Sequence, residues 1–223
     1  MKTHIAGLGL PENSGNAVYV VLTRSTTALS RLVSFWTGAE YTHAAISLDR
    51  GLSYMFSFGR RYANNPFLGC FHREDLSEGV YAKADHVPGI VIALPVSDWQ
   101  YENICGTIRE FLLNSHRYDF NYAGLATQAV GRSHFSERRF YCSEFVYHVL
   151  SEAGVLDLSI PRGRVRPQDF LWLGGEIYKG DLRRFREAGG AGGAGGASNA
   201  GSAACASNIL PFATQTPPRR GAG

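Results

Sequence analysis

A cysteine and a histidine in this chain have the types that nucleophilic catalysis requires. The apolar residues that follow Cys142 recur at helical spacing, at Phe145, Val146, Val149 and Leu150. We therefore expect Cys142 in the first turn of a buried helix, where backbone N–H groups and the positive end of the helix dipole favour a thiolate over a thiol. The alternative is that Cys142 is a small packing residue, which is the common role of an isolated cysteine at the start of an apolar helix.

His43 is the histidine best suited to serve that cysteine. It stands directly before an apolar run, Ala44 to Leu48, which predicts a short strand. A thiol nucleophile needs an imidazole that accepts its proton and later returns it to the leaving group. His116 and His134 are alternative bases in loops on the Cys142 side of the chain, whereas His72 and His86 are expected at the surface in or beside loops.

Three short motifs together resemble a known family. Residues 42–49, 57–60 and 140–146, read THAAISLD, SFGR and FYCSEFV, are similar to the NlpC-type papain-like cysteine hydrolases in their circularly permuted form, the YiiX/YebB-like branch. Lecithin retinol acyltransferase is a more distant relative of that group. In ordinary papain-like enzymes the cysteine helix precedes the histidine strand, whereas in the permuted group the strand comes first, as here. The resemblance runs from about Val18 to about Phe185.

The resemblance implies an α+β fold with an antiparallel sheet packed against the helix that starts at Cys142. It also implies that Cys142 forms an acyl-enzyme, with His43 as base and no cofactor. A third polar group from the strand after the histidine strand orients the imidazole in this family, and Ser57 matches that position best, with Tyr54 and Asp49 as alternatives. Thr42 and Tyr141 are the candidate substrate-binding residues. Tyr141 is equally compatible with a role as a core aromatic.

The family implies that the substrate is an amide or ester, in a cell-wall peptide or a related acyl small molecule. Two alternatives stay open. The first is an acyltransferase acting on lipids with the same cysteine and histidine. The second is a non-catalytic binding protein that keeps the fold, which a weak orienting residue at Ser57 would favour.

Composition excludes several other classes. The basic residues are scattered and the net charge of the 223-residue chain is only +3, which argues against a nucleic-acid partner. The four cysteines lack zinc-binding spacing, so we expect no metal and free thiols in a reducing compartment. The first residues lack the apolar run of a signal peptide, and no run of eighteen apolar residues predicts a transmembrane segment. We therefore expect a cytoplasmic protein, with release by another route and the oligomeric state left open.

The chain divides into an N-terminal loop, residues 1–16, a single domain, residues 17–187, and a disordered Gly/Ala-rich tail, residues 188–223. The sequence predicts strands over 17–22, 43–49, 52–58, 79–85 and 89–94, with a closing hairpin over 176–185. It predicts helices over 26–36, after a capping box at Ser97 and Gln100, within 118–130, from Cys142 and within 166–172.

Overall fold

A six-stranded antiparallel sheet forms the centre of the part of the chain that the computed structural model describes, residues 16–24, 40–60, 69–129 and 131–191. Its strand order is β4-β3-β2-β1-β5-β8. The strands are β1 (Ala17–Thr23), β2 (His43–Ser47), β3 (Met55–Arg60), β4 (Gly69–Glu74), β5 (Pro88–Pro95) and β8 (Glu176–Asp181). The described residues therefore have an α+β fold, as the sequence predicts.

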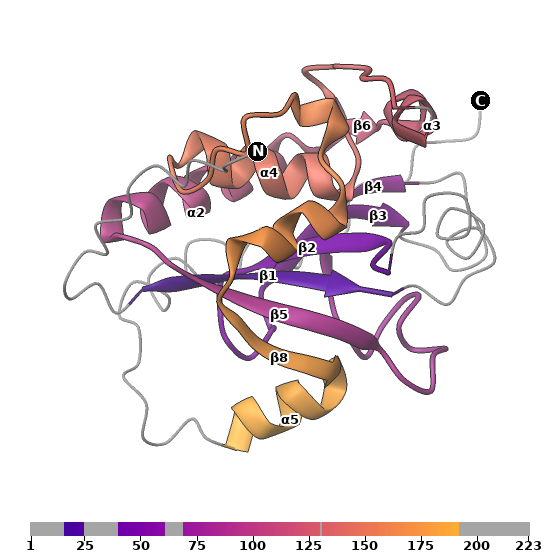
Figure 1. Ribbon diagram of the computed structural model, residues 1–223. Coiled ribbons are helices and arrows are strands. Elements are labelled where there is room, and N and C mark those ends of the chain that lie inside the picture. Colours follow the sequence, from indigo (N-terminus) through magenta and orange to yellow (C-terminus); the bar gives the residue numbers. More distant parts are fainter. Residues whose placement is uncertain (1–15, 25–39, 61–68, 130, 192–223) are drawn as a thin grey trace.

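Helices cover both faces of this sheet (Figure 1). The α-helices are α2 (Asp98–Leu113), α3 (Tyr122–Ala129), α4 (Cys142–Glu152) and α5 (Leu182–Ala191). The short 3-10 helices are η1 (Ser115–Arg117), η2 (Arg162–Arg164) and η3 (Pro167–Leu173), and a two-stranded parallel ribbon joins β6 (Asp119–Phe120) to β7 (Arg139–Phe140). Figure 1 shows α2 and α4 together above the strands and α5 beside β8.

Successive side chains along each strand point to opposite faces of the sheet and pack in two separate cores. Val20 and Leu22 of β1 pack in the larger core beneath α2 and α4, whereas Val21 between them packs in a smaller core with Leu182 and Phe185 of α5. Because both faces are buried, the strands carry apolar residues in continuous runs. The register pairs Thr23 with His43, which places the histidine beside the last residue of β1.

The larger core is mainly aromatic where α4 crosses β2 and β3. Phe58 is fully buried, and its ring lies between 5.4 and 5.8 Å, centroid to centroid, from four other phenylalanine rings, those of Phe71, Phe111, Phe140 and Phe145. These rings come from β4, α2, β7 and α4. This cluster therefore fixes the start of α4 relative to the sheet.

Most of the local predictions are confirmed. Strands form at 17–23 and 88–95, α4 begins at Cys142, and Gly154 follows it with a φ of 63°. The capping box is present, since Ser97 Oγ accepts from Gln100 N at 3.2 Å and Gln100 Oε1 accepts from Ser97 N at 3.0 Å.

Three predictions are wrong, and one strand was missed. Residues 79–85 form turns instead of a strand, and β4 at 69–74 was not predicted. The segment after β8 is α5 instead of the second arm of a hairpin. Cys105 is disulfide-bonded, so the expectation of free thiols fails there, while Cys70 and Cys142 are reduced. The predicted helix at 26–36 and most of the predicted tail lie outside the described residues.

The aromatic core allows a direct test of this packing. We expect Phe58→Ala to lower the free energy of unfolding by about 3 to 5 kcal/mol, because it leaves a cavity among four rings. Phe135→Ala is the matched control: Phe135 is 60% exposed and mainly contacts the guanidinium of Arg162, so its loss should cost about 1 kcal/mol or less. Equal costs in urea unfolding would contradict the assignment of Phe58 to the core.

Candidate active site

The imidazole of His43 is held by a carboxylate from the edge strand β4. His43 Nε2 lies 2.7 Å from Glu74 Oε1, and the two side chains are 16% and 5% exposed. A glycine makes room for this pair, because a Cβ at Gly59 would lie 3.3 Å from His43 Cε1 and 3.4 Å from Glu74 Oε1. Since an ionised carboxylate only accepts hydrogen bonds, Nε2 carries a proton and Nδ1 is left for a second partner.

Ser57 lies next to this pair but does not orient the imidazole directly. Its hydroxyl donates a short hydrogen bond to Glu74 Oε1, the same oxygen that receives the bond from His43. The expectation that Ser57 is the third residue is therefore corrected: Glu74 is the residue that bonds to His43, and Ser57 supports Glu74. The reason is strand order, since β4 pairs with β3 and brings a longer acidic side chain over Ser57.

Neither alternative orienting residue reaches the imidazole. The carboxylate of Asp49 accepts backbone N–H groups of Ser53 and Tyr54, at 2.9 Å and 2.8 Å, and so closes the turn between β2 and β3. The ring of Tyr54 lies under the guanidinium of Arg73 at 5.5 Å. Both residues stabilise the hairpin whose second arm carries Ser57.

Cys142 is the second partner of His43. It is the first residue of α4 and is 9% exposed, and its side chain lies close enough to the imidazole to raise the pKa of His43. Tyr141 before it is extended, with φ −105° and ψ 175°, and the Tyr141 carbonyl accepts the first helical bond from Phe145 N at 3.0 Å. The sulfur therefore lies where the unpaired N–H groups of a helix begin, as the sequence predicts.

Charge distribution favours an ionised pair at this site. Burial works against the charged forms, but the Glu74 carboxylate and the Cys142 sulfur outweigh it and raise the pKa of His43 well above its ordinary value. Burial likewise opposes the charge on Glu74, yet His43, His72 and Ser57 lower the pKa of that carboxyl to about 2. An imidazolium bound to a carboxylate is thus the expected state near neutral pH.

A second buried carboxylate fixes the start of α4. Glu144 is fully buried, and its Oε2 accepts from Tyr141 N at 3.0 Å and from Asn121 Nδ2 at 3.1 Å. Burial raises the pKa of Glu144 to about 7 despite these donors. Asn121 also accepts from Gly124 N at 2.8 Å, which ties the beginning of α3 to the beginning of α4.

The remaining residues predicted from the sequence have different positions in the structure. Tyr141 is only 1% exposed and its hydroxyl accepts from Gln128 Nε2 at 2.8 Å, so it is a core aromatic instead of an exposed cleft residue. Thr42 is half-buried before β2, and its role with substrate stays a prediction. His86 is exposed, as expected. His72 is not: it lies on β4 with its Nε2 at 3.9 Å from Glu74 Oε1. His116 lies in η1, and the backbone carbonyl of His134 accepts from Asn121 Nδ2 at 3.2 Å, so the imidazole that acts on Cys142 is that of His43.

Glu74 is the functional residue that sequence reasoning missed. It is the last residue of a strand of only six residues whose inner face is marked mainly by Phe71, and it stands in a charged run, Arg73 to Asp75, that is typical of a solvated turn. The only signal in the sequence was an acidic residue downstream of the histidine strand. Sequence alone does not show that the strand carrying this residue joins the sheet close to His43. The side chain of Glu74 reaches His43 across β3, which lies between β4 and β2 and has Gly59 beside the pair.

Comparisons with models of protein families, with curated proteins and with solved structures give no match. Within residues 16–24, 40–60, 69–129 and 131–191, no helix is long and apolar enough to span a membrane. The same residues contain no group of three or more His, Cys, Asp and Glu side chains arranged to hold a metal ion. The site is therefore interpreted from its own chemistry.

Replacing Glu74 by glutamine should lower the pKa of His43. Without the negative charge, burial becomes the dominant influence on the imidazole and favours its neutral form. NMR titration of the ring protons measures this shift. Asp181→Asn is the control, because it removes a carboxylate from the exposed His86, 3.1 Å away, and should leave His43 unchanged. An unaltered His43 pKa in Glu74→Gln would contradict the pairing.

The pair should also give stability a definite pH dependence. The lowered pKa of Glu74 contributes stability that is present above its ordinary value of 4.5 and is lost as the pH falls toward about 2. The raised pKa of His43 contributes stability that is present below 6.5 and is lost as the pH rises through its folded value. The difference in unfolding free energy between wild type and Glu74→Gln should therefore be largest between pH 4.5 and 6.5. Urea unfolding tests this, and a difference that is constant with pH would contradict it.

Proposed function

We propose that this protein is a thiol hydrolase that cleaves an amide or ester bond through an acyl-enzyme on Cys142. The observation that carries this proposal is that Glu74 Oε1 lies 2.7 Å from His43 Nε2 while Cys142 lies close enough to the same imidazole to raise its pKa. A nucleophile, a base bonded to it and a third group that orients the base are the elements of catalysis in cysteine hydrolases. The substrate class that we propose is a cell-wall peptide or a related acyl compound.

In the first step the sulfur of Cys142 attacks the carbonyl carbon of the substrate. His43 Nδ1 holds the proton that the thiol has given up, while Nε2 stays bonded to Glu74 and keeps the ring in one orientation. When the tetrahedral intermediate collapses, the imidazolium protonates the departing amine or alcohol. Water then attacks the thioester, His43 accepts its proton, and the sulfur leaves as the product acid forms.

The negative oxygen of the tetrahedral intermediate needs hydrogen-bond donors. The backbone N–H of Cys142 is the donor that we propose, since the first N–H groups of a helix have no acceptor within the helix. Glu144 helps to fix that N–H group, because it bonds to the backbone of the preceding residue, Tyr141. The buried carboxylate thus acts on the geometry of the helix start, several bonds away from the reacting atoms.

Two observations favour an enzyme of the permuted papain-like type over a binding protein that only keeps the fold. The case for a binding protein depended on Ser57 as a weak orienting group, and Glu74 supplies a stronger one. The order of elements also agrees with the permuted group, since the strand with His43 precedes the helix with Cys142. An antiparallel sheet with that helix packed on β2 and β3 is compatible with the same fold.

The activation of Cys142 is tested with iodoacetamide and peptide mass spectrometry. We expect Cys142 to be alkylated at least about tenfold faster than Cys70 at neutral pH, because His43 is placed to accept the proton of Cys142 and α4 puts its sulfur at the start of a helix. His43→Ala should remove most of this advantage, and Asp181→Asn beside His86 is the control that should preserve it. Equal alkylation rates at Cys142 and Cys70 in the wild type would contradict the proposed activation of Cys142 and favour a non-catalytic binding protein.

The reaction itself is tested by trapping the acyl-enzyme. The wild type and Cys142→Ser are incubated with peptidoglycan fragments, acyl lipids and acyl thioesters, and the intact mass is recorded. A mass increase on Cys142 identifies the acyl group, and release of that group to water or to a second acceptor distinguishes a hydrolase from an acyltransferase. If none of the three substrate classes acylates Cys142 although iodoacetamide alkylates it rapidly, the proposed substrates are contradicted. The assignment of Cys142 as the nucleophile would then still stand.

A further inference from the structure

The carboxylate of Glu74 has a third donor that comes from outside the sheet. Tyr81 OH donates to Glu74 Oε2 at 2.9 Å, the oxygen that neither His43 nor Ser57 contacts. Tyr81 belongs to the segment between β4 and β5, which we call the 75–87 loop. Burial and the Glu74 carboxylate raise the pKa of Tyr81 well above its ordinary value, so its hydroxyl keeps the proton that it donates.

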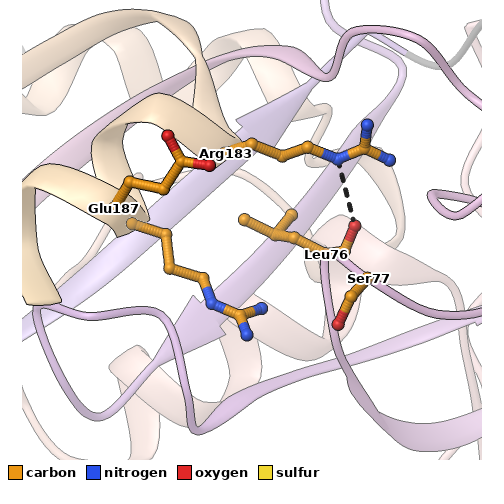
Figure 2. A pocket seen from close by; sticks show the side chains of 5 residues that line it. Leu76, Ser77, Arg183 and Glu187 are labelled. Atoms are coloured by element: carbon orange, nitrogen blue, oxygen red, sulfur yellow. Dashed lines mark hydrogen bonds between the residues drawn. The ribbon is translucent and has the colours of Figure 1, made fainter.

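An arginine of α5 holds this loop in place. Arg183 Nη2 donates to the carbonyl oxygen of Tyr81 at 2.6 Å, and its Nε donates to the carbonyl of Leu76 at 3.4 Å, the bond drawn in Figure 2. A second bond from the same helix joins Arg186 Nη1 to Asp75 Oδ1 at 2.7 Å. Arg183 Nη1 also donates to the carbonyl oxygen of Asp85 at 3.5 Å, so Arg183 holds the loop backbone before, at and after Tyr81.

A pocket of about 310 Å³ lies between α5 and the start of the loop. Figure 2 shows Leu76, Ser77, Arg183 and Glu187 around it. We assign no ligand to this pocket, because its charged groups are largely engaged in holding the loop: Arg183 and Arg186 donate to the loop as described.

We infer that Tyr81 is a positioning residue for the Glu74–His43 pair, and that Arg183 of α5 maintains the reactivity of Cys142 by holding Tyr81 in place. This inference rests on the proposed function. A buried carboxylate keeps one orientation only while its hydrogen-bond donors stay in place. Because the hydroxyl of Tyr81 is such a donor and belongs to a loop, its position depends on the bonds that hold the loop. Six groups surround Glu74 or its partners: Thr23 from β1, His43 from β2, Ser57 from β3, His72 from β4, Tyr81 from the loop and Cys142 from α4.

Tyr81→Phe tests the hydroxyl alone. We expect iodoacetamide to alkylate Cys142 about threefold to tenfold more slowly at neutral pH, with little change in melting temperature. The matched control is Tyr178→Phe: Tyr178 packs in the same core, and its hydroxyl donates to the Asp181 carbonyl at 2.8 Å instead of to Glu74. A melting temperature lowered equally in both variants, with equal alkylation rates, would overturn the role of Tyr81.

A second readout separates positioning from general stability. The carboxyl carbon of Glu74, followed by 13C NMR against pH, should titrate at higher pH in Tyr81→Phe, because the charged form has lost a donor. In Tyr178→Phe the titration should match that of the wild type. This readout does not depend on enzymatic activity: if wild-type Cys142 reacts no faster than Cys70, the proposed function fails, and the Glu74 titration still decides the contact with Tyr81.

Arg183→Met tests the link to α5, with Arg184→Met as the control. Arg184 is the exposed neighbour on the same helix, so both variants remove one positive charge. We expect Arg183→Met to increase hydrogen exchange of the 75–87 loop and to slow alkylation of Cys142, while Arg184→Met does neither. Because Arg183 acts through Tyr81, the double variant with Tyr81→Phe should be no slower than the slower single variant. Additive losses would overturn the link.

Discussion

The contact on which the site depends is the buried pairing of His43 with Glu74. A carboxylate removed from water costs several kcal/mol unless charges and hydrogen bonds replace its hydration. Glu74 receives them from three directions: the imidazole at 2.7 Å, the hydroxyl of Ser57 and the hydroxyl of Tyr81 at 2.9 Å. The same bonds that satisfy the carboxylate also prevent the imidazole from turning. Stability and the orientation of the base therefore have one physical origin at this site.

Both cores of the molecule hold elements that contribute to this site. The larger, aromatic core fixes α4 against β2 and β3 and so determines where Cys142 begins its helix. The smaller core anchors α5 and the 75–87 loop, and through them the donor to the second oxygen of Glu74. His43 is the first residue of β2, and it bonds to Glu74 and lies close to Cys142.

Local patterns in the sequence predicted the elements that carry the cysteine and the histidine, because helical spacing after Cys142 and an apolar run after His43 are properties of short segments. The identity of the third residue was not predictable in the same way. Ser57 lies on the strand next to the histidine strand in the sequence, but Glu74 is one strand further, and its reach depends on strand pairing and side-chain length. Tyr81 was misassigned to a strand, since the apolar residues around it resemble alternation, whereas its loop is held by bonds from α5 that lie about a hundred positions away.

The most direct test of the central claim, that Cys142 and His43 Nδ1 face each other across one site, is cross-linking with 1,3-dibromoacetone. This reagent alkylates a reactive sulfur first and then joins it to a nucleophilic nitrogen within the span of three carbon atoms. We predict a single cross-linked peptide pair that contains Cys142 and His43, lost in His43→Gln. A product in which Cys142 is modified but joined to no histidine, or joined to His72, would contradict the account.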